Sequence, residues 1–186
     1  MNESQEAALV RCCQIGDKEA FRTLVEQYRS MLFGTAYLMI RDRGLAEDAV
    51  QEALIQMWKH LPSLRLHSSF KAWIVRIVIN EVKQQLRRKQ MPTVPLEQAS
   101  EVTGDLDKAE AAMIQNEERQ RLRQVLEMLP KEQREAVVLR YFSELTIPEI
   151  AVVTGSRGGT IKSRLSRAMS HLRELLRSDR NREGER

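Results

Sequence analysis

The sequence is poor in residues that form cross-links. It contains only 2 Cys among 186 residues, and Cys12 and Cys13 are neighbours. A disulfide between adjacent residues is strained, and no third cysteine is present to pair with either one. A disulfide framework is therefore excluded, and we expect two thiols that lie in the core or are partly exposed.

Residues typical of metal and catalytic centres are also scarce. The 3 His, which are His60, His67 and His171, are scattered and have no companion at a metal-ligand spacing. No nucleophile motif, phosphate-binding loop or metal cluster can be recognised in the sequence. We therefore predict no metal, no cofactor, no small-molecule substrate and no enzymatic activity.

Long apolar runs are missing as well. No stretch of 18 apolar residues occurs, and the first residues, MNESQEAALVRCC, lack a basic segment before an apolar one. The chain is expected to be soluble and cytoplasmic, without direct insertion into a membrane.

The residues that are present predict an all-α protein. Gly and Pro are few, with 8 and 5 copies, and β-branched residues do not cluster in alternating runs. Nearly every apolar segment instead repeats at intervals of three or four residues, which is the period of an amphipathic helix.

Charge is distributed in blocks along the chain. The formal net charge is only +4, but residues 65–89 contain seven Lys or Arg and one Glu, and residues 145–186 contain nine Lys or Arg and five acids. Residues 91–120 between them carry two basic and seven acidic side chains. This pattern indicates two polyanion-binding surfaces on either side of an acidic spacer; the alternative, a set of solvated helix faces, explains one-sided blocks poorly.

Composition divides the chain into two small helical domains. We predict a first domain over residues 1–90, a flexible acidic linker over 91–115, which contains Pro92, Pro95 and Gly104, and a second domain over 116–178. The second should be a four-helix domain. The last residues, 179–186, have no apolar side chain and are expected to be disordered.

The most informative stretch is residues 145–176. Its pattern predicts a short helix over 147–153, a turn at Gly155 and a second helix beginning near Thr160. Basic and hydroxyl side chains gather in the first half of that second helix, at Lys162, Ser163, Arg164, Ser166 and Arg167. Two helices joined in this way are typical of a helix-turn-helix DNA reader, although a plain helical hairpin with a charged face has the same periodicity.

A second candidate surface lies around residues 63–89. A short polar loop over 63–69 precedes a helix that displays cations and one asparagine, which are Lys71, Arg76, Asn80, Lys83, Arg87 and Arg88. Cations beside a polar loop suit single-stranded nucleic acid, whose phosphates meet the charge while the bases enter pockets. For the aromatic Phe70 and Trp73, a place in the core is favoured over base stacking.

The helix predicted over residues 42–61 has an acidic and amide-rich face. Glu47, Asp48, Gln51, Glu52 and Gln56 lie opposite its apolar stripe. Such a face is usually only solvated, so composition alone leaves its role open.

Four segments give the chain a family resemblance. They are LAEDAVQEALIQMWKHL (45–61), SSFKAWIVRIVINEVKQQLRR (68–88), LEMLPKEQREAVVLRYFSELTIPEIAVVTG (126–155) and GTIKSRLSRAMSHLRELL (159–176). In sequence and in order, they resemble bacterial RNA polymerase sigma factors of the extracytoplasmic function (ECF) group, the two-domain members of the sigma-70 superfamily. The resemblance implies a promoter-specificity subunit that binds core RNA polymerase, through the β′ clamp and the β flap, and promoter DNA, under the control of an anti-sigma factor.

The resemblance also assigns roles to residues. It implies core polymerase contacts at Glu47, Asp48, Gln51, Glu52 and Gln56. It implies contacts with the minus-10 element at His67, Ser68, Ser69, Lys71, Arg76, Asn80, Lys83, Arg87 and Arg88, with Asn80 against an unstacked base. It implies contacts with the minus-35 element at Arg157, Thr160, Lys162, Ser163, Arg164, Ser166 and Arg167.

The sequence departs from the family pattern at four places: Pro148, the turn SRGGT, the small Ser166, and His67 in the loop. Two other functions stay open at this point. A helix-turn-helix regulator that never binds polymerase would use the same reading helix but leave the acidic face unexplained. A helical adaptor without a nucleic-acid role would show no salt-dependent affinity for DNA.

Overall fold

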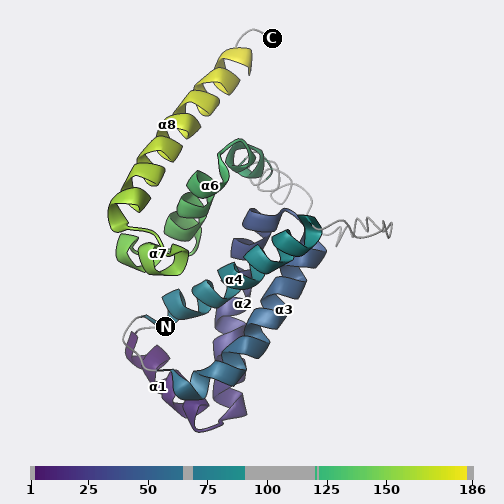
Figure 1. The fold of residues 1–186 in the computed structure, drawn as a ribbon, viewed down its shortest axis with the longest axis vertical. Coiled ribbons are helices and arrows are strands. Elements are labelled where there is room, and N and C mark those ends of the chain that lie inside the picture. The colour runs from purple at the N-terminus through teal and green to yellow at the C-terminus, as the bar shows by residue number, and fades with distance from the viewer. Residues whose placement is uncertain (1–2, 65–68, 91–119, 121, 184–186) are drawn as a thin grey trace.

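The computed structural model describes residues 3–64, 69–90, 120 and 122–183. Helices and the turns between them make up this part of the chain, and no strand occurs in it. The prediction of an all-α fold with two helical domains is confirmed (Figure 1). The predicted linker, residues 91–115, lies outside the described residues.

The N-terminal domain contains helices α1 (Glu3–Gln14), α2 (Lys18–Ile40), α3 (Arg43–His60) and α4 (Phe70–Gln90), with the short 3-10 helix η1 (Leu61–Ser63) after α3. Helices α2, α3 and α4 pack against one another, and α1 packs on α2. Their apolar stripes meet in one core, whose largest fully buried side chains include Leu24, Leu32, Met57, Phe70 and Ile74. Phe70 is thus a core residue, as the periodicity favoured.

Local signals in the sequence set the ends of these helices. Gly16 has a φ of 92°, which a side chain would strain, so α1 ends there. The Asp17 carboxylate accepts hydrogen bonds from the backbone N–H groups of Glu19 and Ala20 and caps α2.

Asp42 caps α3 in the same way, and it also lies 3.2 Å from Lys89 Nζ of α4. The hydrogen bond from the Leu45 backbone N–H and the neighbouring lysine outweigh desolvation, so the pKa of Asp42 lies below its usual value. This carboxylate therefore joins the start of α3 to the end of α4.

The C-terminal domain contains helical residues 122–127, α6 (Lys131–Val137), the π-helix η2 (Val138–Phe142), α7 (Ile147–Thr154) and α8 (Gly158–Glu183). Helix α8 packs on α6 and α7 (Figure 1). The apolar residues predicted for α8, including Ile161 and Ala168, are buried. This arrangement agrees with the helix-turn-helix domain expected from the sequence.

One predicted helix differs from expectation. The sequence predicts a single α-helix over residues 132–142, but the last five residues form η2 instead. The helical spacing of this stretch predicts Tyr141 in the core. The wider turn carries Tyr141 outward instead, where it is 61% exposed, so this prediction is wrong. Leu122, whose spacing with Val125, Leu126 and Leu129 belongs to the helical pattern that ends at Pro130, is 59% exposed.

The end of the chain also differs from expectation. Helix α8 begins at Gly158, two residues earlier than predicted, and continues to Glu183, so residues 179–183 are helical rather than disordered. No Gly or Pro occurs between Gly159 and Gly184, and Arg and Glu are good helix formers even without an apolar stripe. Residues 179–183 have no apolar side chains that would indicate packing against a core, but they can still form a helix.

The two domains contact each other directly. Helix α7 packs on α4, and η2 packs on α2. Leu139, Leu145, Ile150, Val153 and Ile161 of the C-terminal domain join the same apolar cluster as the core of the N-terminal domain. The two halves predicted from composition therefore share this cluster, and the C-terminal domain has a second one formed by Leu126, Leu129, Val137 and Ala168.

Candidate nucleic-acid interface

The reading helix begins after a turn that the local sequence defines well. Thr146 and Glu149 form a capping box at the start of α7, and Pro148 lies in the first turn, where no backbone N–H is required. Gly155 has a φ of 67° and ends α7. The departures from the family pattern at Pro148 and in SRGGT are thus compatible with a regular helix-turn-helix.

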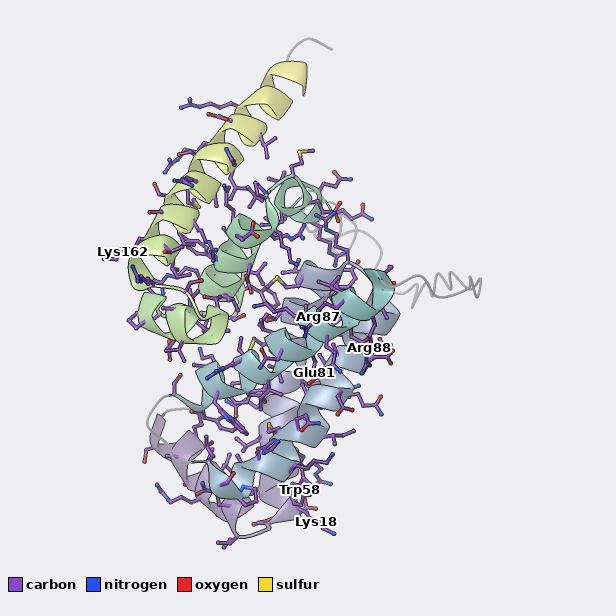
Figure 2. The ribbon with its side chains drawn as sticks, in the orientation of Figure 1. Lys18, Trp58, Glu81, Arg87, Arg88 and Lys162 are labelled. Atoms are coloured by element: carbon purple, nitrogen blue, oxygen red, sulfur yellow. The ribbon has the colours of Figure 1, made fainter. Side chains whose placement is uncertain are left out.

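The first half of α8 presents most of its predicted DNA contacts to solvent. The exposed members are Arg157, Thr160, Lys162, Ser163, Ser166 and Arg167. Ile161 and Ala168 lie buried on the opposite side. Lys162 lies at the N-terminal end of α8, on the outer side of the domain (Figure 2).

Arg164 differs from its neighbours. Its side chain is half-buried, and its Nη1 donates a hydrogen bond of 3.2 Å to Ser156 Oγ in the turn. This contact holds the turn against the reading helix. The side chain therefore braces the turn in this structure rather than pointing freely outward.

The second cluster of predicted contacts lies on α4. Arg76, Asn80 and Arg87 recur at intervals of four and seven residues, share one face of the helix and are exposed or partly exposed. Within the described residues no acidic side chain pairs with these two arginines. His67 and Ser68 lie outside the described residues, so the structure does not place them.

Three other members of this cluster contact the C-terminal domain. Lys71 Nζ lies 3.4 Å from Glu144 Oε2, and Lys83 Nζ lies 3.1 Å from Glu135 Oε1. Ser69 Oγ donates a hydrogen bond to Glu149 Oε1. Burial tends to raise the pKa of Glu149, but the hydrogen bonds from Ser69 and Thr146 and the nearby Lys71 lower it overall.

Arg88 lies in a groove between α3 and α4 of about 450 Å³. Acidic and amide side chains from both helices line it, namely Asp48, Gln51, Glu52, Gln56, Glu81, Gln84 and Gln85. Desolvation raises the pKa of Glu81, and the nearby Glu52 raises it further while Arg88 opposes the change. Arg88 thus sits between the predicted DNA face and the acidic face, close to Arg87 (Figure 2).

The acidic face of α3 is placed as the periodicity predicted. Glu47 pairs with Arg43 at 3.0 Å, and Glu52 accepts a hydrogen bond of 2.8 Å from Gln56. Asp48 and Gln51 are exposed. All five predicted polymerase contacts therefore lie on one helix, accessible or partly accessible.

A groove of about 780 Å³ between α2 and α3 adds residues that sequence reasoning missed. Its α2 wall contributes Val25, Glu26, Arg29, Ser30 and Phe33, and its α3 wall includes Glu47, Gln51 and Leu54. The helical spacing of Val25 and Phe33 is that of core residues, and such spacing does not distinguish a groove floor from an interior. The partly buried state of both side chains is visible only in the packed helices.

The described residues offer neither a metal centre nor a membrane span. No group of three or more His, Cys, Asp or Glu side chains in these ranges could hold a metal ion. Equally, none of the helices there has the length and apolar character that a membrane span requires.

Comparisons with known families match both domains. Residues 24–91 match the family Sigma-70 region 2, and residues 119–172 match Sigma-70 region 4. The first match includes α3 and α4, and the second includes α6, η2, α7 and the reading half of α8. The two families occur in the order expected from the four sequence segments.

Relatives match nearly the whole chain. The RNA polymerase sigma-H factor of Pseudomonas aeruginosa is 33% identical over 185 residues, covering 95% of this chain and 96% of that protein. The ECF RNA polymerase sigma factor SigM of Mycobacterium tuberculosis is 33% identical over 176 residues, covering 94% of this chain and 86% of that protein.

Solved structures share the fold. The sigma factor RpoE from Bartonella quintana, solved in complex with the anti-sigma factor NepR, has a TM-score of 0.65 and 30% identity, with 86% of this chain and 98% of that chain covered. CnrH, solved with the cytosolic domain of CnrY, has a TM-score of 0.70 at 24% identity, covering 92% and 97% of the two chains, and supports the fold alone. With both sigma-70 regions in order and relatives that span almost its full length, this chain belongs to the ECF group of RNA polymerase sigma factors.

Proposed function

We propose that this chain binds core RNA polymerase and directs it to promoters through two separate DNA-reading surfaces. The observation that carries this proposal is the pair of exposed cationic faces on α4 and α8, in the two regions that match the sigma-70 families. Arg76, Asn80 and Arg87 contact the minus-10 element, and Asn80 takes an unstacked base. The α8 residues Lys162, Ser163, Ser166 and Arg167 contact the minus-35 element in the major groove.

Polymerase binding is assigned to α3 and the α2–α3 groove. Gln51 lines both this groove and the polar groove beside α4, so the proposed surface is continuous across the α3 ridge. The carboxylates Glu47, Asp48 and Glu52 give this surface a negative charge, while the floor of the larger groove is apolar at Phe33 and Leu54. A basic partner with apolar anchors fits both properties.

The chain is proposed to carry out no reaction itself and to act in the cytoplasm. Its control by an anti-sigma factor is supported by the structural relative solved with NepR, whose identity with this chain is 30%. The α4 and α8 faces would be the targets of such a partner, since covering either one removes a DNA contact.

Run-off transcription with purified core polymerase tests the minus-35 assignment. Lys162→Ala and Arg167→Ala should each weaken binding to a cognate promoter by about 1–3 kcal/mol, since each removes a cation from the proposed base or phosphate contacts. Weaker promoter binding should appear as a lower yield of run-off transcript. Binding to core polymerase should be unchanged. Lys18→Ala is the matched control, because Lys18 is exposed in the N-terminal domain, far from Lys162 (Figure 2). Equal loss of promoter and polymerase binding would contradict this assignment.

A pull-down with core polymerase tests the docking face. The double change Asp48→Ala and Glu52→Ala should lower the affinity for core polymerase, whereas Glu19→Ala, which removes an exposed acid on α2, should not. If wild-type protein binds operator DNA but not core polymerase, the chain acts as a regulator and not as a polymerase subunit. If the double variant binds polymerase as tightly as wild type, the docking face lies elsewhere.

A further inference from the structure

A small cavity lies where α2 meets the C-terminal domain, and arginines dominate its wall. Its volume is about 50 Å³. Residues of both domains line it, namely Tyr37, Leu38 and Arg41 of α2 and Arg123, Leu126, Glu127 and Arg134 of the C-terminal domain. Among the described residues, three guanidinium groups therefore share this wall with one carboxylate. Such an excess of one charge in a cavity is typical of a site for a ligand of the opposite charge.

The contacts of Arg41 and Arg123 leave most of their charge uncompensated. Arg41 Nη1 lies 3.8 Å from Glu127 Oε2, and Arg41 Nη2 donates a hydrogen bond of 2.9 Å to the Glu127 carbonyl oxygen. The Arg123 guanidinium lies 5.4 Å from the centre of the Tyr37 ring. A carbonyl oxygen and an aromatic ring attract a cation but do not neutralise it.

Arg134 is the least satisfied of the three arginines. Its Nε is buried and has no hydrogen-bond partner within the part of the chain that the structure describes. Burial lowers the pKa of Arg134, and the like charge of Arg41 lowers it further, while Glu127 partly opposes the change. A buried donor of this kind is commonly completed by a bound water or ion. An anion in the cavity would supply both the missing acceptor and the missing negative charge.

The packing around the cavity holds these arginines in place. Gly34 and Arg41 are seven residues apart, or nearly two helical turns, so they lie on the same face of α2. The Phe142 ring packs so closely on Gly34 that a side chain there would collide with it. Next to it, Thr35 Oγ1 and Ser143 Oγ form a buried hydrogen bond of 3.0 Å. A wall that is fixed before binding loses less conformational entropy when a ligand enters.

A phosphate group matches the cavity in charge, in hydrogen bonding and in size. The wall has an excess of two positive charges, and a phosphate group carries about −1.5 to −2 charges at neutral pH. Guanidinium groups bind phosphate oxygens through pairs of parallel N–H donors. A single water needs about 10–15 Å³, so a cavity of about 50 Å³ has room for a small anion but not for a base and a sugar as well.

We propose that Arg41, Arg123 and Arg134 form a binding site for a small phosphate ligand, either inorganic phosphate or a compact phosphate monoester. None of the three arginines is among the residues assigned above to DNA or to core polymerase. The site is therefore an addition to the proposed function and does not rest on it. Because both domains contribute to the wall, the full chain is required for binding.

Isothermal titration calorimetry of the full chain with sodium phosphate, at constant ionic strength and about pH 7.5, tests the site. The wild-type chain should bind one phosphate in a saturable manner. Arg41→Gln/Arg134→Gln should bind it about tenfold or more weakly, because two charge-assisted hydrogen bonds are lost. The control Arg11→Gln/Arg173→Gln removes the same charge from exposed positions outside the cavity and should bind as wild type does. Absence of saturable binding by wild type, or equal binding by the two double variants, overturns the proposal.

A variant that should bind more tightly guards against loss of binding through misfolding. Glu127→Gln removes the carboxylate from the wall and keeps the carbonyl oxygen that Arg41 contacts, so phosphate should bind about threefold or more tightly. Glu132→Gln, which removes an exposed acid of α6, should leave the affinity unchanged. Equal affinities of Glu127→Gln and Glu132→Gln would contradict the proposal.

Two further titrations identify the ligand. Glycerol 3-phosphate in place of inorganic phosphate shows whether the site prefers the monoester or the free anion, and saturable binding of either one supports the proposal. A short DNA duplex tests the nucleic-acid alternative. If Arg41→Gln/Arg134→Gln weakens binding to the duplex but not to phosphate, the arginines contact a DNA backbone and the proposal is wrong.

Discussion

Two neighbouring cysteines show how strongly side-chain environment depends on helix position. Cys12 is exposed on α1, whereas Cys13 is buried in the core between α1 and its neighbours. Burial raises the pKa of Cys13 to about 11, and the nearby Asp17 carboxylate and Cys12 contribute in the same direction. At pH 8 the Cys13 thiol therefore remains almost entirely protonated, and it is the thiolate that reacts.

We predict that one thiol per chain reacts readily with a disulfide reagent such as DTNB at pH 8. Cys12→Ser should remove the fast reaction, whereas Cys13→Ser should leave it in place. Unfolding in guanidinium should make both thiols of the wild-type chain reactive. A fast reaction that survives in Cys12→Ser would show that α1 opens readily and that Cys13 is not protected by packing.

At the residue scale, the sequence predicted which side chains face solvent better than which side chains they contact. The exposure of Arg76, Asn80 and Arg87 follows from their helical spacing. The partners of Lys71 and Lys83 lie more than 50 residues away in sequence, so periodicity gave no sign of them. Arg164 was predicted to contact DNA, but its hydrogen bond to Ser156 depends on the turn geometry, which the sequence left undetermined.

At the scale of single elements, the short helix α7 depends on its cap. Thr146 Oγ1 accepts a hydrogen bond from the Glu149 backbone N–H, and the Glu149 carboxylate accepts one of 2.8 Å from the Thr146 backbone N–H. Eight residues give few internal hydrogen bonds, so these two contribute a large share of the order at the N-terminus of α7.

Thr146→Ala should lower the free energy of unfolding by about 1 kcal/mol, because it leaves an N-terminal backbone N–H of α7 without its partner. Thr146→Ser keeps the hydroxyl and should stay close to wild type. Urea unfolding followed by circular dichroism measures the difference. A Thr146→Ala protein as stable as wild type would mean that water replaces the cap without loss.

Element boundaries were predictable where a single residue determines them and not where packing does. Gly155 ends α7 as the sequence predicted, and Gly16 and Asp17 mark the end of α1 and the start of α2 by the same kind of local signal. The change from α6 to η2 has no local signature, since residues 138–142, VLRYF, contain neither Gly nor Pro. The wider turn is instead associated with the contact of Phe142 and Ser143 with α2, which only the folded chain reveals.

At the scale of the whole molecule, the contact between the domains should respond to acid. Burial tends to raise the pKa of Glu149, but the hydrogen bonds from Ser69 and Thr146 and the nearby Lys71 lower it overall. Ser69 and Lys71 belong to the other domain, so the part of this effect that they contribute favours the docked domains. A carboxylate with a lowered pKa contributes stability that is present above its usual value, 4.5, and is lost as the pH falls through the lowered value. Protonation of Glu149 should therefore loosen the contact with Ser69 and Lys71.

We predict that the radius of gyration measured by small-angle X-ray scattering increases as the pH is lowered from 7 to about 3.5. In Glu149→Gln the increase should be smaller, because that side chain no longer titrates. Circular dichroism at each pH separates domain opening from loss of helix. An equal increase in wild type and Glu149→Gln would assign the acid response to other carboxylates.

The π-helix η2 makes the number of residues in this stretch as important as their identity. The wide turn holds one residue more than an α-helical turn does, so deleting one residue from 138–141 would leave no extra residue for it and would close it to a regular turn. Phe142 and Ser143 would then no longer meet Gly34 and Thr35, although every side chain involved would still be present. The number of residues in this turn thus determines how the two domains approach each other.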